Sequence, residues 1–571
     1  MNNWEVDNTG AVQLRLGFTQ VTDLGAALQY LGTYYTTTGD QVFVAVVDNA
    51  FWEATDIAGP WTNRTGSVVL STTDGPWIGA DLQGRFYLAN GTDPAITHQY
   101  GSNAQTLKTA SYLPPPTGLA AVFTGTPAAT AYYHAVTAIT ANGETMVSNV
   151  AGITTGAAAL NATNYITLTW DAVPGAQGYK IYRAAAGYKM IGIVGGLTNE
   201  FVDSGQAVLP GGPPASNTAF NTQSTWDGRP IQGFTVLARG RSQRVLAWRD
   251  NAVWASALSN GLDWLSPNDA FQLEVAGGSD NRIRAGDGLY DFTILWSRTN
   301  AFIYTGSSPS DIAQSKVLGI GCDAPNSILH SGDDLYFWSE FGPNRFSRVQ
   351  SGQDIQSQQV FGAKVERTVQ NLSNRSYWSK IVAFPDTHRS RLGWAYPNGT
   401  DTTNSKVLLF NYDIGAWSRH TLGSIVNVVT DDLRVAYAGL SDGRIVKLYN
   451  GATDAGTAIA GTYETGWYDS QAFLNRINNW LDLIVDSSQG NYSFTVEIFH
   501  DFGTTATSTH TLTQALTDGN PIYSTSGLSN IHRIYTSGFG KYFKLKFTVA
   551  SSTTAPRVWG WRPEMHSRGT R

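Results

Sequence analysis

The chain has 571 residues, enough for about three to five domains of ordinary size. Its formal net charge of -6 is small for that length, and only 14% of its residues are charged, which excludes a protein held to nucleic acid or to an anionic membrane by its overall charge. The single cysteine, Cys322, excludes an internal disulfide framework and a cysteine-based zinc cluster, and we expect its side chain to be buried as a small apolar group.

Short antiparallel strands are predicted along most of the chain, because β-branched or aromatic residues alternate with polar ones between Asp-Gly, Asn-Gly and Gly-Asp turn signals. Helical periodicity is scarce. In chain order the expected strand pairs are 41–54, 76–93, 244–258, 291–306, 327–349, 406–420 and 434–450. The N-terminal residues lack the basic and apolar regions of a secretion signal, and no run of about 18 apolar residues occurs, so we expect neither classical secretion nor a bilayer-spanning helix.

The strand pairs return roughly every 45 to 55 residues, which predicts a β-propeller of about seven blades. One blade cannot bury both faces of its sheet, so neighbouring blades must pack face to face through bulky side chains. The stretch "WRDNAVWASALSNGLDW" carries three such residues, Trp248, Trp254 and Trp264. We expect these tryptophans to serve packing, with a carbohydrate or peptide groove as the alternative.

Two proline-rich segments, "YLPPPTGL" (112–119) and "VLPGGPPAS" (208–216), interrupt the repeat and read as linkers. The predicted domains are therefore an N-terminal segment with the first blades (1–112), an inserted domain (113–210), the remaining blades (217–456) and a C-terminal domain (457–571). The fold class is all-β throughout.

The inserted domain is predicted to be an immunoglobulin-like sandwich. Alternation places Ile166, Leu168 and Trp170 on one face of a strand, and Tyr179, Ile181 and Arg183 on one face of the next. This Trp-strand and Tyr-strand resemble those of fibronectin type III modules. The strand "YYHAVTAITANGE", which is similar to a late strand of that family, comes earlier here, so the topology departs from the family.

The alternating pattern after residue 457 has no blade spacing and predicts a β-sandwich of jelly-roll type. It ends in a basic tail, in which one acid, Glu564, faces four arginines: Arg557, Arg562, Arg568 and Arg571. Such a tail is solvated or docks on an acidic neighbour.

No catalytic, cofactor-binding or metal-binding residues are predicted. The nine histidines occur singly, with no HxH or HxxxH pair, and the chain has no GxSxG, GxxxxGK[ST] or GxGxxG motif placed for chemistry. "STTDGPW" (71–77) is weakly similar to the aspartate hairpins of propeller sialidases. The aspartates Asp250, Asp287, Asp333, Asp334 and Asp413 lie in or beside turns, where Asx-turns account for them.

Arginines gather in "LARGRSQRVLAWRD", which holds Arg239, Arg241, Arg244 and Arg249, and again at Arg282 and Arg284. They are either solvated or meet phosphates or an acidic partner, because arginine makes bidentate contacts. Together with Arg562 and Arg568, the first four are the candidates for contacts with other subunits or partners.

Three strings resemble the core of tail proteins of short-tailed bacteriophages, the nozzle or tail tubular protein B class: "RVLAWRDNAVWASALSNGLDW", "DNRIRAGDGLYDFTILWSRTNAFIYTG" and "GCDAPNSILHSGDDLYFWSEFGPNRFSRV". The opening "GAVQLRLGFTQV" and the segments "GWYDS", "KYFKLKF" and "RPEMHSRG" are similar to the ends of those proteins.

The resemblance implies a virion protein of the tail, assembled in the host cytoplasm, that forms a ring, a homo-hexamer, at the distal end. Such a ring borders the DNA exit channel without binding the genomic DNA specifically and contacts adapter proteins, other tail proteins and tail fibres. The alternatives are a propeller glycosidase or depolymerase, which needs two close carboxylates, and an adhesin that binds host sugars through exposed aromatic rings.

Overall fold

Nearly all of the regular secondary structure consists of antiparallel strands. The computed structural model describes residues 2–567 except 72–74, 108, 141–142, 185–186, 197, 224–229, 238–243, 265–268, 276–281, 349–354, 358, 470–475, 487–491, 514–521, 526–528 and 536–538. Within this part, α1 (Glu366–Leu372) is the one α-helix, and the 3-10 helices are η2 (Pro325–Ser327), η3 (Gln359–Gly362), η4 (Arg375–Lys380) and η5 (Thr387–Arg389). None of these helices is long and apolar enough to span a bilayer.

The central part of the chain is a β-propeller of seven blades, as the repeat predicts. Blade 1 consists of β4 (Leu28–Tyr35), β5 (Gln41–Val47), β6 (Ala50–Ala54) and β7 (Thr62–Asn63). Blade 2 consists of β8 (Ile78–Leu82), β9 (Arg85–Ala89), β10 (Ile96–Gln99) and β11 (Gln105–Thr106). Blade 3 consists of β22 (Gly233–Val236), β23 (Val245–Arg249), β24 (Ala252–Ala255) and β25 (Phe271–Glu274). Blade 4 consists of β26 (Ala285–Leu289), β27 (Phe292–Trp296), β28 (Ala301–Thr305) and β29 (Ala313–Leu318).

Blade 5 consists of β30 (Leu329–Ser331), β31 (Asp334–Ser339), β32 (Gly342–Arg348) and β33 (Ile355–Ser357). Blades 6 and 7 share one seven-stranded sheet of β34 (Val382–Asp386), β35 (Arg391–Tyr396), β36 (Asn404–Asn411), β37 (Ala416–Thr430), β38 (Ala436–Leu440), β39 (Arg444–Lys447) and β3 (Thr19–Asp23).

The long strand β37 belongs to both of the last blades. Its first residues pair with β36, and after a register shift at Ile425 its remainder pairs with β38. The outermost strand of blade 7 comes from the other end of the propeller sequence, because β3 pairs with β39. The propeller is therefore closed by a strand that precedes blade 1 in the chain.

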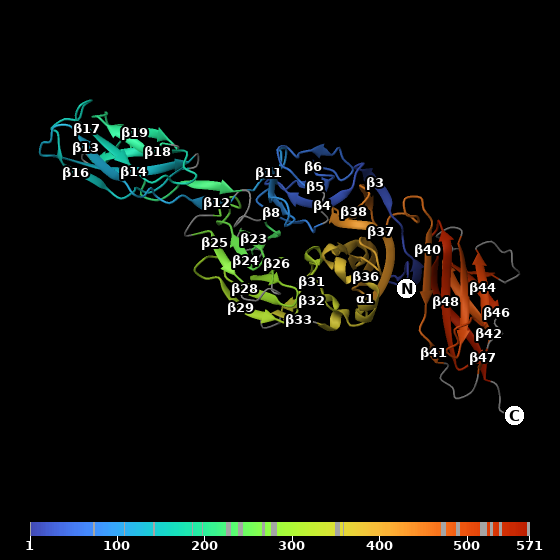
Figure 1. Cartoon of the computed structure of the whole chain (residues 1–571). Helices are drawn as coiled ribbons and strands as arrows, with labels where there is room; N and C mark the ends of the chain where they lie inside the picture. Colours follow the sequence, from blue (N-terminus) through green and yellow to red (C-terminus); the bar gives the residue numbers. More distant parts are fainter. Residues whose placement is uncertain are drawn as a thin grey trace. The chain divides into compact units, whose positions relative to one another are not determined.

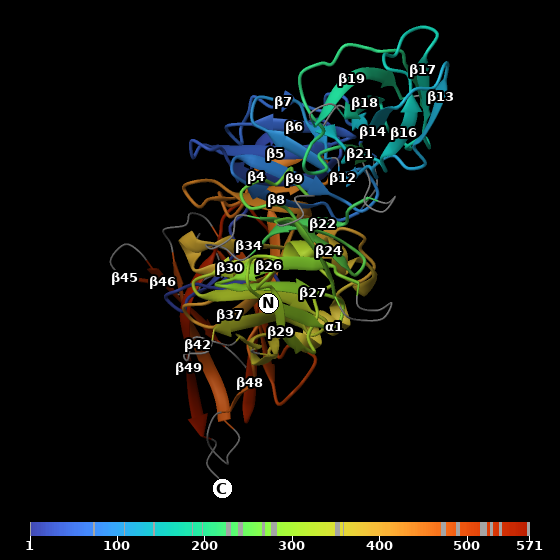
Figure 2. The ribbon, with the colours of Figure 1, turned by 90° about the vertical axis from the view of Figure 1, so that its left-hand side faces the viewer.

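The innermost strands form a closed circle. β4 contacts β37 and β8, β8 contacts β22, β22 contacts β26, and β34 contacts β30 and β37. The remaining step runs from β26 to η2, which leads into β30. Figure 1 looks along the axis of this circle, with the blades following one another from blue through green and yellow to orange, and Figure 2 shows the same sheets from the rim.

Several hairpins of the propeller turn through residues with a left-handed backbone. Between β5 and β6, Asp48 and Asn49 have φ of 43° and 68°. Between β8 and β9, Gln83 and Gly84 have φ of 50° and 74°. Two consecutive left-handed residues match the twist of the paired strands, which is why the Asp-Asn and Gln-Gly positions mark the turns in the sequence.

Aromatic side chains pack the blades against one another. Trp248, Trp296, Trp338 and Trp394 are among the largest fully buried side chains, and each lies on the second strand of its blade. The ring of Trp296 stacks on Phe346 of the next blade with centroids 6.0 Å apart. Tryptophans therefore pack neighbouring blades against each other.

Of the three tryptophans in the 248–264 stretch, Trp248 and Trp264 are buried and Trp254 is half-buried. Trp248 lies in a core that also holds Ile78 of blade 2 and Phe302 of blade 4. Gly233 leaves room for this indole, because a Cβ there would lie 2.4 Å from Trp248 Cζ2. Blades 7 and 1 share a core of their own, so the packing continues around the circle.

The insertion is a two-sheet sandwich, and it belongs to a compact unit of residues 107–229 and 262–270. One sheet holds β13 (Ala120–Thr124), β17 (Tyr165–Thr169) and β20 (Glu200–Asp203), and the other β14 (Thr130–Thr140), β15 (Gly143–Glu144), β16 (Ala151–Gly156), β18 (Gly178–Ala184) and β19 (Tyr188–Gly195). β12 (Thr109–Tyr112) and β21 (Phe220–Gln223) pair with each other where the chain enters and leaves.

The predicted alternation within the insertion is confirmed. Ile166, Leu168 and Trp170 are buried in one core with Tyr179 and Ile181. The hydroxyl of Tyr179 accepts a hydrogen bond of 2.8 Å from the backbone of Val173. The strand β14 precedes the Trp-strand β17 and pairs with the Tyr-strand β18. The strand that is similar to a late strand of the family therefore precedes the Trp-strand, as the sequence order indicates.

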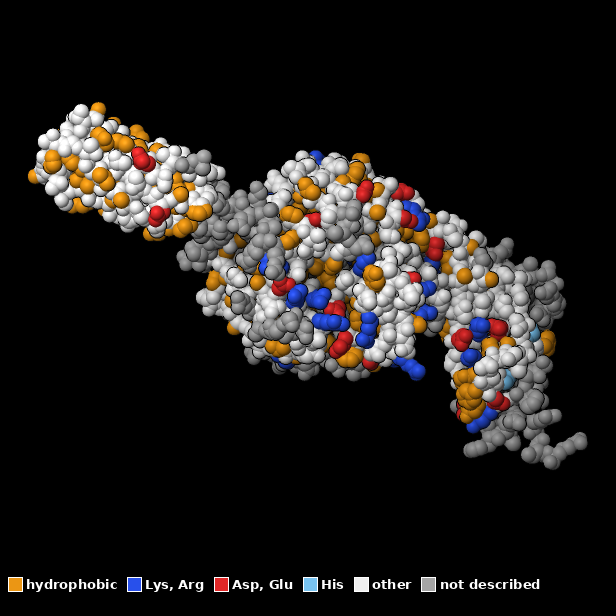
Figure 3. All heavy atoms as spheres, in the orientation of Figure 1, with side chains coloured by type: hydrophobic (Ala, Val, Ile, Leu, Met, Phe, Trp, Pro, Cys, Tyr) orange, Lys and Arg blue, Asp and Glu red, His pale blue; other side chains and the backbone are white. Residues whose placement is uncertain are grey.

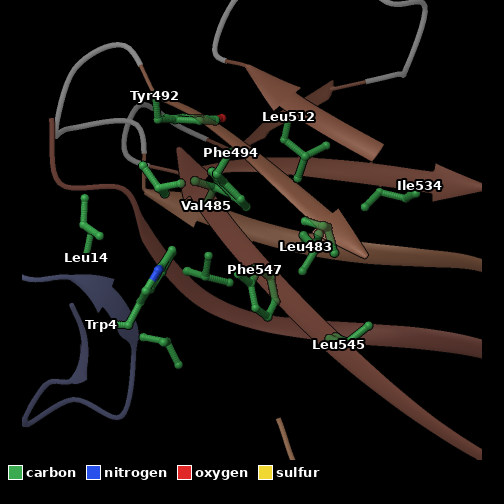
Figure 4. Packing of buried hydrophobic residues seen from close by; sticks show 14 of the residues in the cluster. Trp4, Leu14, Leu483, Val485, Tyr492, Phe494, Leu512, Ile534, Leu545 and Phe547 are labelled. Atoms are coloured by element: carbon green, nitrogen blue, oxygen red, sulfur yellow. The ribbon is translucent and has the colours of Figure 1, made fainter. Parts of the chain in front are cut away.

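The C-terminal domain is a second β-sandwich. One sheet holds β42 (Arg476–Asp486), β45 (Ile522–Thr525), β46 (Ser529–Tyr535), β47 (Phe539–Gly540) and β49 (Arg557–Ser567), together with β1 (Trp4–Val6) and β2 (Val12–Leu14) from the N-terminus. The other holds β40 (Ile459–Glu464), β41 (Tyr468–Asp469), β43 (Ser493–His500), β44 (Ser508–Thr513) and β48 (Tyr542–Ser552). Figure 4 shows Trp4 and Leu14 of the N-terminal hairpin beside Phe547 in the shared core.

Candidate functional site

Two adjoining pockets lie at the hub of the propeller, where the innermost strands begin. The first hub pocket is a cavity of about 210 Å³ and the second is one of about 250 Å³, and Pro76 and Ser379 line both. All seven blades contribute to their walls, in order through Gln29, Pro76, Gln232, Arg284, Asn326, Ser379 and Ile425. A pocket to which every blade contributes is the natural place to look for a ligand in a closed β architecture.

Polar side chains bridge blades across the hub. Asn326 Nδ2 donates to the carbonyl of Trp77 at 3.1 Å, which joins blade 5 to blade 2. These two blades are not neighbours in the circle. Asn404 Nδ2 donates to the carbonyls of Lys380 and Ile425 at 2.6 Å and 3.0 Å. The hub is therefore closed by side chains at this level and is not an open channel.

The second hub pocket has a mixed charge with arginines in excess. Arg284 Nε and Arg298 Nε lie 3.5 Å and 3.2 Å from the two oxygens of Asp323. Burial raises the pKa of Asp323, and the two guanidinium groups act in the opposite direction. Arg282, which lines the same pocket, lies 3.6 Å from Asp250. Figure 3 shows basic side chains gathered beside acidic ones near the middle of one propeller face.

The small number of carboxylates limits the reactions that this site can catalyse. Glycoside hydrolysis needs two carboxyl groups about 5 to 10 Å apart. Asp323 is the one carboxylate among the described residues that line the second hub pocket, and Asp48 the one among those of the first. Among the described residues, no group of three His, Cys, Asp or Glu side chains is arranged to hold a metal ion. The arrangement suits a small polar or anionic ligand better than acid/base chemistry.

Of the arginines nominated from the sequence, the three that the structure describes, Arg244, Arg249 and Arg562, do not lie in one site. Arg244 is 3% exposed and donates to the carbonyls of Ser307 and Ser256 at 2.9 Å and 2.8 Å, so its guanidinium is used inside the propeller and is not presented to a partner. Arg249 lies 3.6 Å from Asp250, whose φ of 53° marks the turn between β23 and β24. Arg239 and Arg241 lie outside the described residues.

Arg562 of the basic tail forms an ion pair within the C-terminal sandwich. Arg562 and Arg533, on two different strands, both bind Asp482 on β42, at 2.7 Å and 2.8 Å. The two arginines hold the pKa of Asp482 below its usual range. Arg562 itself remains 71% exposed and is the nominated arginine that the described surface presents most openly. Arg568 and Arg571 lie outside the described residues.

The sequence did not indicate that the N-terminal segment connects the propeller and the C-terminal sandwich through ion pairs. Arg15 is 1% exposed and its guanidinium donates to both oxygens of Asp454, at 2.8 Å and 2.5 Å. Arg391 on blade 6 donates to Glu5 and, at 2.6 Å, to Asp386. The available signal was two short alternations of apolar and polar residues, "WEVD" and "VQLRL". Neither is long enough to establish a strand, and neither indicates partners several hundred residues away.

Further buried polar groups also hold sheets together. Cys322 is fully buried as expected, and burial raises the pKa of its thiol to about 12. Of the singly placed histidines, His98 binds Glu53 at 2.9 Å and His134 binds Asp203 at 2.9 Å. Both pairs lie inside their domains, away from the hub lining. Their role is structural.

No family model matches the chain, and no curated protein matches it. Solved structures of similar fold include a catalytically inactive virginiamycin B lyase from Staphylococcus aureus with quinupristin, 10% identical over 76% of this chain and 98% of that chain, with a TM-score of 0.27. A chain of the mitotic checkpoint complex is 8% identical over 75% of this chain and 94% of that one, with a TM-score of 0.29. The Pan2 WD40 domain of Neurospora crassa is 6% identical over 76% and 94%, with a TM-score of 0.27.

Proposed function

We propose that the chain is a non-enzymatic structural protein of a bacteriophage tail, a nozzle subunit. Six copies form a ring at the distal end, border the DNA exit channel and dock adapter proteins, other tail proteins or fibres. The resemblance of three long strings and both ends of the sequence to nozzle proteins suggests this role. The paragraphs below give the features of the molecule that support it.

The observation that carries the proposal is the fastening of the propeller to the C-terminal sandwich. Strands β1 and β2 complete a sheet of the sandwich, and β3, a few residues later, completes blade 7. Glu5 on β1 and Arg15 between β2 and β3 form ion pairs that are largely removed from solvent. One short segment thus contributes strands to both β domains and ion pairs beside them, which suits a subunit whose domains keep their places in an assembly.

Because the hub is closed, the proposed DNA channel runs between the subunits of the ring and not through the propeller of one subunit. The bond from Asn326 to Trp77 crosses between blades that are not neighbours, so a nucleic-acid duplex has no passage along the propeller axis. Identical subunits joined head to tail close into a ring when their rotation closes, and such a ring encloses a channel of its own. The chain has a net charge of -6, so it carries no overall positive charge that would bind DNA passing through the channel.

The mass of the purified protein in solution tests the proposal. One chain has a mass of 61.7 kDa, and native mass spectrometry should detect a closed assembly of six chains, alone or after addition of its neighbouring tail proteins. A chain that stays monomeric at every concentration and with every neighbouring tail protein would contradict it.

A glycosidase is the second candidate, and one observation favours it. Burial raises the pKa of Asp323 in the second hub pocket, which is the property that a general acid needs. If the protein cleaves host polysaccharide, release of reducing ends by the purified chain should be lost in Asp323→Asn. Absence of cleavage by the wild-type chain removes this candidate.

A further inference from the structure

Three aromatic rings lie together at one end of the C-terminal sandwich. Trp467, Phe502 and Tyr542 form a row in which neighbouring ring centroids are 4.9 Å apart in both pairs. Phe502 is 60% exposed, and the other two rings are half-buried. Figure 3 shows hydrophobic side chains gathered at this end of the sandwich, near β41. We call these three residues the aromatic platform.

The backbone under the aromatic platform is held in an unfavourable conformation. Asp501 and Phe502 have φ of 45° and 61°, in the left-handed region that favours glycine, and a bulky residue there is an outlier. The turn is closed by a bond of 2.8 Å from Gly503 N to the carbonyl of His500. A glycine in place of Phe502 would fit the turn better, so folding alone does not account for the ring.

Neighbouring groups fix this conformation. Asp501 Oδ1 accepts hydrogen bonds from the backbone of Lys541 and Tyr542 at 2.7 Å and 2.9 Å. Gly540 permits the approach, because a Cβ there would lie 2.7 Å from Asp501 Oδ2. The structure thus maintains a strained turn that presents an apolar ring to solvent. Strain of this kind, held in place by its surroundings, is characteristic of binding sites.

Charged side chains of both signs border the rings. The ammonium of Lys544 lies 5.4 Å from the Trp467 ring centre and 3.2 Å from Glu464. The ammonium of Lys541 lies 5.0 Å from the Tyr542 ring centre and is acted on by the charge of Asp469. With Asp501 in the turn, two lysines face three carboxylates, so the platform has no excess of positive charge. A polyanion such as a nucleic acid therefore gains little electrostatic attraction here.

The size of the patch argues against a large protein partner. A fully buried aromatic side chain covers about 150 to 250 Å². Three rings that are already partly buried offer far less than the roughly 800 Å² that each partner contributes to a stable protein interface. A ligand that matches the platform has an apolar face the size of a ring and hydroxyl groups at its edge, which the lysines and carboxylates can bind.

We propose that the aromatic platform binds a neutral saccharide, whose ring stacks on Phe502 between Trp467 and Tyr542 while Lys541, Lys544, Asp469 and Glu464 bind its hydroxyl groups. This inference goes beyond the structural role and does not rest on it. The saccharide belongs to a surface glycan, since the open platform can accept one unit of a longer chain.

Affinity electrophoresis tests the proposal with three neutral polysaccharides, dextran, mannan and galactan, and with heparin as an anionic comparison. We expect at least one neutral polymer to retard the full chain and to quench its tryptophan fluorescence. Phe502→Gly should weaken the affinity at least ten-fold while leaving the melting temperature unchanged or higher, because glycine relieves the turn. Tyr412→Ala, which removes a ring that is 40% exposed on the propeller, is the matched control and should bind as the wild type does.

Each other outcome overturns the saccharide proposal. These outcomes are no retardation by any neutral polymer, stronger retardation by heparin, or equal retardation of wild type and Phe502→Gly. If Phe502→Gly no longer assembles, the platform is a contact between copies. That result overturns the saccharide proposal but agrees with the proposed ring of the wild-type chain. A chain that binds glycan through the platform but never assembles would instead contradict the proposed ring.

Discussion

Arg15 donates two hydrogen bonds to Asp454, a residue 439 positions away in the sequence, with donor–acceptor distances of 2.8 Å and 2.5 Å. The arginine is buried, so removing it leaves an unpaired carboxylate and empty space. We predict that Arg15→Ala destabilises the chain by about 3 to 5 kcal/mol, the usual cost of breaking a buried ion pair from one side. Urea denaturation measures the change, and the propeller and C-terminal sandwich should then unfold in separate transitions.

Arg444 and Asp442 supply the matched control. Their ion pair has a similar length, 2.7 Å, but both side chains lie at the surface, 34% and 51% exposed. Arg444→Ala should change the free energy of unfolding by less than about 1 kcal/mol. Equal losses in Arg15→Ala and Arg444→Ala would mean that the N-terminal segment does not fasten the two domains.

Trp248 tests the packing between blades. It is fully buried among side chains of three blades, whereas Trp254, six residues on, is half-buried. Trp248→Ala should cost about 3 to 5 kcal/mol and Trp254→Ala distinctly less, because the cost follows the buried volume removed. Thermal melting followed by circular dichroism provides the comparison. A larger loss from Trp254→Ala would contradict the assignment of Trp248 to the core.

The C-terminal sandwich should lose stability in acid. Burial lowers the pKa of His532 from 6.5 to about 4, and it lowers those of His500 and His510 in the same domain. An unfolded histidine takes up a proton below about pH 6.5 while the folded one does not, so stability is complete above that pH and is lost as the pH falls toward 4. His532 alone should account for about 2 to 3 kcal/mol.

Urea denaturation between pH 7 and pH 4 measures this loss, and His532→Gln should flatten the dependence. Among the described residues, the polar contact of the His532 ring is a hydrogen bond with the hydroxyl of Tyr492. A glutamine side chain at this position can accept the same bond. A variant with the same pH dependence as the wild type would show that His532 is not the group responsible.

The inserted sandwich should be removable. Tyr112 pairs with Phe220 in the ribbon of β12 and β21, so the two ends of the insertion lie opposite each other. Replacing residues 113–219 by Asn-Gly turns the ribbon into a two-residue hairpin. The remaining chain should fold, with its free energy of unfolding changed by no more than about 1 kcal/mol. Insoluble or unfolded product would show that the propeller depends on the insertion.

The propeller could be predicted from the sequence because its signals are local. Each of the seven expected strand pairs is an antiparallel pair in the structure, since alternation and a turn signal such as Asp48-Asn49 determine a hairpin within about 15 residues. The core positions Ile166, Leu168 and Trp170 of the insertion were likewise readable from a period of two.

The connections between distant segments could not be predicted. β1 and β2 have three residues each, too few for any periodicity, and they pair with or pack on strands from the other end of the chain. The burial of Arg244 was also hidden, because its partners are backbone carbonyls at Ser256 and Ser307 and not side chains of opposite charge. The hub pockets require the closed circle, since each blade contributes only one or a few residues to them.

Electron microscopy of the purified chain, alone and with its neighbouring tail proteins, tests the central claim most directly. The account predicts closed rings of six copies with a central opening between subunits and seven-bladed wheels within each subunit. Isolated single particles under all conditions, or open filaments without a closed ring, would contradict it.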